Sequence, residues 1–233
     1  MIVVLGDSWA KGTWRQIDNN LHEISGPGFA EYFKPARVIN ISQGGSSNSQ
    51  QLARFDQLAE LLPFQSHDEF YWVVTNPIRC IMSAWREEEQ LKPWINNISS
   101  TVDQAITQVL LDFLTGLNNR AGQQDVSINL IGGLCDLTQV DFTPYSNLTA
   151  IVPSWVQLLD AEHTGSIYTT EHMVKISAVI QQDRPELLDE WLDIVEQAQS
   201  KDRLFDQLAN NRLFECYHPN ELAHQLLMTK LTV

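Results

Sequence analysis

The sequence predicts one doubly wound α/β domain in which short parallel strands alternate with helices. Apolar runs rich in Val and Ile recur along the chain, bounded by Gly, Asn or Pro, as is typical of buried parallel strands. A long stretch with helical periodicity separates two of these runs. With 233 residues, the chain suits one large domain better than two small ones, so we expect a single domain over 1–233.

Each expected strand is short and apolar. Four candidates have this character clearly, namely Ile2–Leu5, Arg37–Ile41, Phe70–Thr75 and Val126–Ile131. A weaker fifth candidate, Leu148–Val152, is stopped by Pro153. Strands that alternate with helices indicate a parallel sheet covered by helices.

Helical periodicity is strongest between the third and fourth strand candidates. Apolar residues follow a spacing of three and four from Val102 to Leu117, and Gly116 with Asn118-Asn119 predicts the end of this helix. The stretch 154–211 is longer than a connection in a sheet needs. Within it, Pro185 suits a first helical turn, and apolar residues from 187 to 195 form a stripe. We therefore expect 154–211 to form a helical insertion or cap over the edge of the sheet.

Composition excludes several classes of partner. The net charge of −14 argues against nucleic-acid binding, which draws on clustered Lys and Arg. The three cysteines, Cys80, Cys135 and Cys216, lie far apart and lack metal-ligand spacing, which indicates no disulfide framework and no metal site. No apolar run reaches membrane-spanning length, and the run at Met1–Leu5 is too short for a signal peptide. We expect a cytoplasmic protein without a membrane partner.

Two short motifs near the ends of the chain carry the chemistry. Gly6-Asp7-Ser8 follows the first strand, and Glu215-Cys216-Tyr217-His218-Pro219 precedes a final helical pattern from Glu221 to Leu231. A serine hydroxyl needs a neighbouring base, and the base needs a group that orients it. Ser8, His218 and Glu215 offer these three roles. By itself Gly-Asp-Ser is a common turn, but Ser8 lies at the carboxyl end of a strand, where open α/β sheets bind ligands.

Two further segments follow expected strands and contain hydrogen-bond donors. The stretch 40–48, Asn-Ile-Ser-Gln-Gly-Gly-Ser-Ser-Asn, has paired glycines that permit a close approach of the backbone to a ligand. Thr75-Asn76-Pro77 brings a side-chain amide to another carboxyl end. Acyl transfer needs such donors around the developing oxyanion. Each segment taken alone also reads as an ordinary turn.

These four pieces, in this order, resemble the SGNH hydrolases, also called GDSL-type esterases. The four blocks of that family carry a Ser, a Gly, an Asn and a His, which here correspond to Ser8, Gly45, Asn76 and His218. Gly45 matches better than Gly44 because it lies five residues after Asn40, as in the family's block. The resemblance implies a flavodoxin-like α/β/α sandwich with five parallel strands. It also implies an oxyanion hole made by the N–H groups of Ser8 and Gly45 and the amide of Asn76.

The sequence departs from the family pattern at three places. Trp9 stands where the family name expects Leu, Val74 stands where the family has Gly, and Glu215 stands where it has Asp. Glu215 is one methylene longer than Asp, which leaves open a Ser–His dyad helped by a backbone carbonyl. Asp136 and Asp206 are substitute acids. Trp9 and Arg79 are candidates for substrate contact, although packing also explains Trp9.

The function that this resemblance implies is hydrolysis of an ester by a serine nucleophile, without a metal or organic cofactor. An acetylated carbohydrate or small molecule is one expected substrate, because seven tryptophans invite stacking on sugars. Two other classes stay open. One is a non-catalytic module that binds a carbohydrate or acyl ligand, and the other is a flavodoxin-like cofactor domain that shares the architecture alone. The oligomeric state is open.

Overall fold

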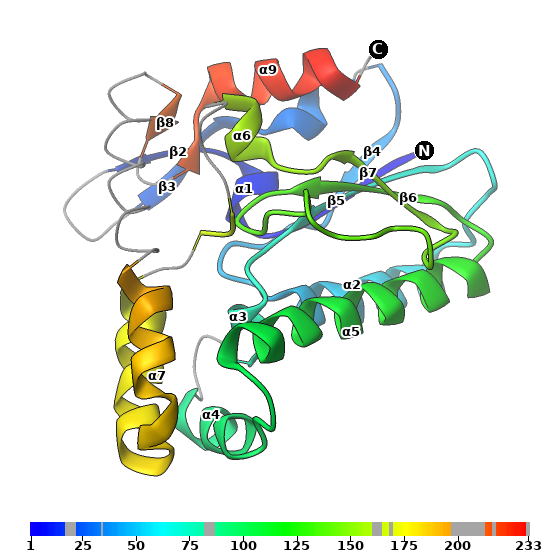
Figure 1. Ribbon diagram of the computed structural model, residues 1–233. Helices are drawn as coiled ribbons and strands as arrows, with labels where there is room; N and C mark the ends of the chain where they lie inside the picture. The colour runs from blue at the N-terminus through cyan, green and yellow to red at the C-terminus, as the bar shows by residue number, and fades with distance from the viewer. Residues whose placement is uncertain are drawn as a thin grey trace.

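A parallel sheet of five strands, in the order β4-β1-β5-β6-β7, forms the centre of the computed structural model (Figure 1). The structure describes residues 1–16, 22–33, 35–81, 87–159, 165–167, 170–196, 213–215 and 218–231. The strands of the sheet are β1 (Ile2–Leu5), β4 (Val38–Asn40), β5 (Glu69–Val74), β6 (Ile128–Gly132) and β7 (Leu148–Val152). The predicted fold class, a flavodoxin-like three-layer α/β/α sandwich, is therefore confirmed.

Successive residues of each strand point to opposite faces of the sheet. Each face contributes apolar side chains to a separate core cluster, so both faces are covered. Val3, Leu5 and Trp72 pack against α2 (Asn48–Leu61) and α5 (Val102–Gln123). Val4 and Val73 belong to the core of the other face. Short helices and the last helix cover that face, namely α1 (Ser8–Lys11), η1 (Phe29–Phe33), α6 (Trp155–Leu159) and α9 (Glu221–Leu231). Figure 1 shows these two helical layers on either side of the strands.

The predicted end of the long helix is wrong. α5 continues through Gly116 and Asn118 to Gln123, seven residues after Gly116. Leu117 and Ala121 are buried in the same core as the earlier apolar positions of the helix. A glycine inside a helix costs only about 1 kcal/mol relative to alanine, and burial of the following turns outweighs that cost.

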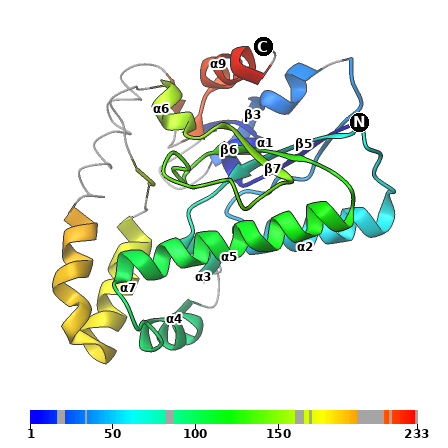
Figure 2. The same cartoon turned by 45° about the vertical axis from the view of Figure 1, so that its right-hand side comes forward.

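Most of the described part of the region 154–211 is helical, apart from a turn at 165–167. It contains α6, α7 (Thr170–Asp183), η2 (Pro185–Leu187) and a helix of residues 188–196. α7 and the helix of 188–196 share a separate apolar cluster with α3 (Ile78–Ile81), α4 (Glu87–Asn96) and the first turns of α5. In both views α7 lies beside α4, beyond the N-terminal end of α5 (Figures 1 and 2). Residues 160–164, 168–169 and 197–212 of this region lie outside the described residues.

Two small antiparallel ladders lie at the carboxyl edge of the sheet and bring the segment after β1 next to the segment before α9. β2 (Gly12–Gln16) pairs with β3 (His22–Pro27), and β8 (Phe214–Glu215) pairs with β9 (His218–Pro219). β9 contacts α1 and β2, both of which follow β1 directly. Among the described helices, none has the length and apolar character that crossing a bilayer requires.

Candidate active site

Ser8 is the first residue of α1, in a tight turn after β1. Gly6 has a φ of +148°, and a Cβ at this position would lie 2.8 Å from Ala10 Cβ, so only glycine fits here. Asp7 is the N-cap of α1 and accepts a hydrogen bond from the Trp9 N–H at 2.9 Å. The turn therefore holds the Ser8 side chain at the carboxyl end of β1, next to the point where the strand order reverses.

His218 lies against Ser8 although the two are 210 residues apart in sequence. Its Nε2 is 2.9 Å from Ser8 Oγ, within hydrogen-bond distance. His218 is half-buried and opens β9, which leads directly into α9. The Asn220 side chain caps that helix by accepting from the Ala223 N–H at 3.2 Å. The structure thus brings together the two residues that the sequence proposes as nucleophile and base.

The sequence offers three acids that could orient the His218 imidazole. Glu215 stands opposite His218 in the β8–β9 ladder, but its side chain lies outside the described part of the structure, as does Asp206. Asp136 uses its two carboxylate oxygens for the Thr138 N–H at 2.9 Å and the Gly165 N–H at 2.6 Å. It therefore holds the turn at 165–167 in place.

The loop after β4 passes close to Ser8. The Gln43 N–H donates to the Gly6 carbonyl at 3.0 Å, which ties this loop to the turn before Ser8. A Cβ at Gly44 would lie 3.7 Å from Ser8 Cβ, whereas Gly45 has a φ of +71° and open space around it. A Cβ at Gly44 would make only ordinary van der Waals contacts, so the left-handed conformation of Gly45 is the feature of this loop that favours glycine.

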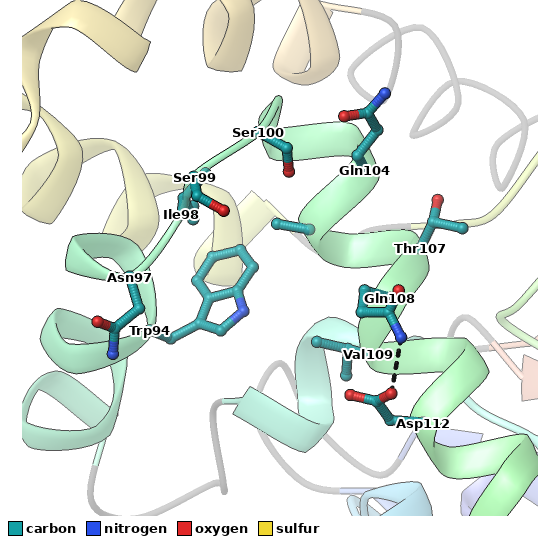
Figure 3. Close-up of a pocket in the computed structure, with 11 residues that line it drawn as sticks. Trp94, Asn97, Ile98, Ser99, Ser100, Gln104, Thr107, Gln108, Val109 and Asp112 are labelled. Carbon is teal, nitrogen blue, oxygen red and sulfur yellow. Dashed lines mark hydrogen bonds between the residues drawn. The ribbon is translucent and has the colours of Figure 1, made fainter.

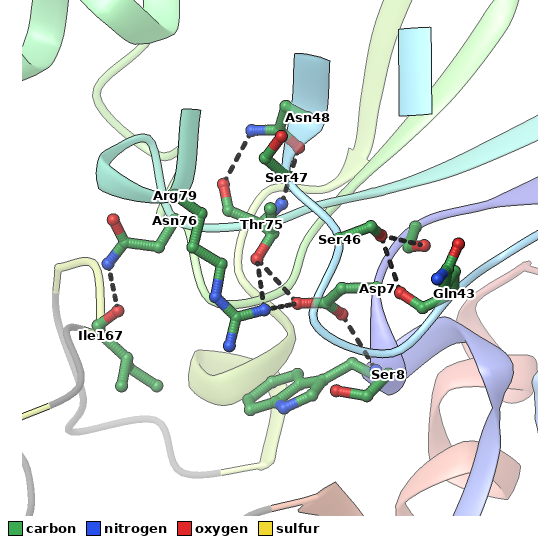
Figure 4. A network of polar contacts seen from close by, with 12 residues as sticks. Asp7, Ser8, Gln43, Ser46, Ser47, Asn48, Thr75, Asn76, Arg79 and Ile167 are labelled. Atoms are coloured by element: carbon green, nitrogen blue, oxygen red, sulfur yellow. Dashed lines mark hydrogen bonds and ion pairs between the residues drawn. The ribbon is translucent and has the colours of Figure 1, made fainter. Parts of the chain in front are cut away.

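Asn76 lies at the carboxyl end of β5 and is 2% exposed. Its Oδ1 accepts from the Ile78 N–H at 2.8 Å, and its Nδ2 donates to the Ile167 carbonyl (Figure 4). These two bonds fix the amide plane. Figure 4 shows the amide directed towards Ile167, with Arg79 between it and Ser8 in this view.

Asn48, which the sequence analysis did not single out, anchors the segment before Asn76. Its side chain donates to the Thr75 carbonyl at 2.9 Å and accepts from the Thr75 N–H at 3.0 Å (Figure 4). Asn48 is the first residue of α2, whose N-cap, Ser47, forms a capping box with Gln50. The Ser47–Gln50 spacing of the capping box predicts the start of a helix from the sequence. It does not predict that Asn48 bonds to Thr75, which follows β5.

A buried ion pair connects the Ser8 turn to the Asn76 segment. Asp7 Oδ2 accepts from Thr75 Oγ1 at 2.7 Å and from Arg79 Nη1 at 2.9 Å, as Figure 4 shows. The side chains of Arg79 and Asp7 are 16% and 1% exposed. Arg79, a candidate for substrate contact, is therefore engaged with Asp7.

Most of the described tryptophans serve the core. Trp9, the other candidate for substrate contact, is 2% exposed and packs edge-on against Trp155 with ring centres 5.8 Å apart. Trp72, Trp155 and Trp191 are fully buried as well. The packing explanation for Trp9 agrees with its position. Trp14 and Trp94 are the tryptophans with described side chains that reach the surface in part.

A second histidine near the site, His224, lies on α9 and is fully buried. Its Nδ1 accepts from the Phe29 N–H at 3.0 Å, and its ring packs against Phe29 and Trp155. Burial lowers the pKa of His224 to about 4, and the neighbouring His218 contributes to this lowering. His224 is therefore neutral at pH 7 and has a packing role.

A pocket of about 660 Å³ lies elsewhere, between α4 and α5 (Figure 3). Trp94 forms one side of it, and Gln104, Gln108 and Asp112 of α5 lie along the other. Its lining contains one ionisable side chain, Asp112, and no histidine.

Comparison with models of known protein families finds no match to this chain, and comparison with curated proteins finds none either. Within the described residues, no group of three or more His, Cys, Asp or Glu side chains is arranged to hold a metal ion.

Proposed function

We propose that this protein is a serine hydrolase of the SGNH type that cleaves carboxylic esters. The single observation that carries the proposal is the 2.9 Å contact between Ser8 Oγ and His218 Nε2. The contact joins two motifs from opposite ends of the chain at the carboxyl edge of the sheet, where open α/β folds bind ligands. A serine hydroxyl beside an imidazole is the arrangement that generates an alkoxide-like nucleophile at neutral pH.

In the proposed reaction, His218 Nε2 takes the proton from Ser8 Oγ while the oxygen attacks the ester carbonyl. The C–O bond to the alcohol breaks, and the same proton passes from His218 to the leaving alkoxide. An acyl group is then left on Ser8. A water molecule repeats the sequence, with His218 again as base, and releases the carboxylic acid. These steps require serine, imidazole, an orienting acid and water.

Donors for the oxyanion come from the three neighbouring strand ends. The Ser8 N–H opens α1 and so has no acceptor within that helix. The backbone at Gly45 and the second amide hydrogen of Asn76 complete the proposed hole. Each such donor contributes roughly 3 kcal/mol to stabilising the transition state of acyl transfer.

The positions of the tryptophans bear on which class of ester we propose as the substrate. Trp9, Trp72, Trp155 and Trp191 are too buried to stack on a sugar. Trp14, which reaches the site, is already stacked on His218. We therefore propose a small acyl ester as the substrate class, because the tryptophans whose side chains are described give the expected carbohydrate ester no support.

The test is hydrolysis of p-nitrophenyl acetate and butyrate by the wild type, Ser8→Ala and Ser42→Ala. Ser42 is a matched control, because it is also a buried serine at this edge but its Oγ has no hydrogen-bond partner. We expect Ser8→Ala to lose at least about 10³-fold in kcat and Ser42→Ala to keep full activity. A fluorophosphonate should label Ser8 alone. Equal, low hydrolysis by all three proteins without labelling would favour the non-catalytic binding module.

The proposed acid can be tested separately. Glu215→Gln should lower kcat by about 10²- to 10⁴-fold, since an amide in place of the carboxylate favours the wrong imidazole tautomer. Glu215→Asp should retain much more activity. An effect of Glu215→Gln below about tenfold would assign the orienting role to a backbone carbonyl, while leaving Ser8 and His218 as a dyad.

A further inference from the structure

Trp14, on the hairpin that follows α1, lies close to three segments at this site, those of Ser8, His218 and Gly44. Its indole Nε1 donates to the Ser8 carbonyl at 2.9 Å. Its ring stacks on His218 with ring centres 5.1 Å apart and planes inclined by 26°. A Cβ at Gly44 would lie 3.5 Å from Trp14 Cη2, so the far end of the indole also reaches the glycine loop.

The hairpin that carries Trp14 is irregular at this residue. The pairing of β2 with β3 shifts register between Thr13 and Trp14, and the extra residue, Ser25, lies on β3. Such irregularities are common beside active sites. Trp14 is half-buried, so one part of its ring packs and another part meets solvent.

The geometry points to Trp14 as the positioning residue that holds the His218 imidazole against Ser8. The stacked indole restricts rotation of the imidazole, while the Nε1 bond fixes the indole to the backbone of the nucleophile itself. One rigid side chain thereby contacts both base and nucleophile and contributes to their relative position, alongside the group that orients the imidazole from its other nitrogen. This role rests on the proposed function, because it concerns the proton transfer between Ser8 and His218.

The same stacking also acts during the reaction. When His218 accepts the proton of Ser8, its ring becomes a cation, and the face of an indole attracts cations. That attraction is present in the transition state and absent with the neutral imidazole of the free enzyme. Interactions of this kind raise kcat with little effect on KM.

The experiment compares Trp14→Leu and Trp14→Phe with the matched control Trp191→Leu. Trp191 is a fully buried indole whose Nε1 also makes a hydrogen bond, to Ser177 Oγ at 2.8 Å, but it belongs to the cluster around α4 and α7. We expect Trp14→Leu to lower kcat by about 100-fold with little change in KM, since misplacing a reacting group by 1 Å has an effect of this size. Trp14→Phe keeps a stacking ring and should recover most of the loss. Trp191→Leu should leave kcat within about twofold of the wild type, because distant sites act independently.

A double-variant cycle shows whether Trp14 acts through His218. In the His218→Ala background, Trp14→Leu should lower kcat no further, because the residue that it positions is gone. Equal losses in the two backgrounds would overturn the inference. So would a Trp14→Leu variant with wild-type kcat.

A crystal structure of Trp14→Leu separates failure of this inference from failure of the proposed function. The inference requires the separation of His218 Nε2 from Ser8 Oγ to grow beyond hydrogen-bond distance in this variant. A separation unchanged from 2.9 Å overturns it, whatever the activity. If the wild type neither hydrolyses esters nor reacts with a fluorophosphonate, the proposed function fails, and this distance alone decides whether Trp14 positions His218. Trp14→Met, which also lacks a stacking ring, supplies the same measurement if Trp14→Leu does not fold.

Discussion

Two regions are rich in polar side chains: the carboxyl edge of the sheet around Ser8, called the Ser8 edge, and the pocket between α4 and α5, called the Trp94 groove. The polar side chains of the two regions differ in burial and in their hydrogen-bond partners. At the Ser8 edge, Asp7, Asn48 and Thr75 are each 1% exposed, and their polar side-chain atoms are bonded to one another or to neighbouring backbone. In the groove, Gln104, Gln108 and Thr107 are exposed on the surface of α5. The polar side chains of the Ser8 edge are fixed by bonds within the protein, whereas those of the groove are exposed to solvent.

This difference separates a preorganised site from an ordinary surface. A buried polar group that loses its partner cannot turn to water, so a change at one residue of the Ser8 edge affects its neighbours. An exposed group has water available and tolerates substitution. Fixed donors are also what acyl transfer needs, because they stabilise the oxyanion without reorganising during the reaction.

The largest effect on the free energy of unfolding is expected at the ion pair between Asp7 and Arg79. Asp7→Asn keeps an acceptor for the Trp9 N–H, but it leaves the Arg79 guanidinium without its counter-ion. We expect a loss of about 3 kcal/mol in the free energy of unfolding, at the lower end for broken buried ion pairs because Arg79 is partly exposed. Urea unfolding measures this loss.

A double-variant cycle with Arg79→Met tests whether the charge is responsible. The double variant Asp7→Asn/Arg79→Met should be more stable than the sum of the two single losses predicts, because it removes both charges together. Additive losses, or a loss below about 1 kcal/mol in Asp7→Asn, would mean that this ion pair is no more important than a surface pair.

His224 makes stability depend on pH. Burial, with a contribution from His218, lowers its pKa to about 4, below the usual value of 6.5, so the folded state favours the neutral ring. The unfolded chain therefore takes up a proton first as the pH falls. The stabilisation is complete above pH 6.5 and is lost on acidification towards pH 4, by about 3 kcal/mol in total.

The check is the free energy of unfolding between pH 4 and 7 for the wild type and His224→Gln. The variant removes the titrating ring and should show a slope smaller by about one proton over this range. Carboxylates titrate in both proteins, so the difference between the two curves isolates His224. Identical slopes would show that the buried ring does not resist protonation.

A smaller loss is expected for Asn48→Ala. The substitution removes both hydrogen bonds to the Thr75 backbone at a site that is 1% exposed. Leaving buried backbone groups unsatisfied should lower the free energy of unfolding by about 2 kcal/mol. Because Thr75 precedes Asn76, kcat for ester hydrolysis should fall as well. Ser49→Ala, on the following residue of the same helix, provides a control for helix effects.

The sequence predicts the sheet well because its strands are buried on both faces and therefore apolar throughout. It also pairs Ser8 with His218, which the structure places 2.9 Å apart, since each stands in a short motif beside a strand or a helix. It could not find Asn48 or Trp14. Their roles depend on partners in other segments, on β5 for Asn48 and on β9 for Trp14, and no spacing within the chain encodes such contacts. The end of α5 was missed because burial of Leu117 and Ala121 outweighs the local signal of Gly116.

The smallest effect is expected in the Trp94 groove, where Gln108→Ala changes an exposed polar residue of α5. The Gln108 amide donates to Asp112 Oδ1 at 2.7 Å, one turn further along the same helix. Loss of such a pair destabilises a helix by about 0.2–0.5 kcal/mol, and the higher helix propensity of alanine offsets a few tenths of it. The free energy of unfolding should therefore change by less than about 0.5 kcal/mol, with kcat unaltered. A loss as large as that of Asn48→Ala, measured in the same urea series, would mean that the groove is as preorganised as the Ser8 edge. The contrast between exposed and buried polar networks would then not explain where the chemistry lies.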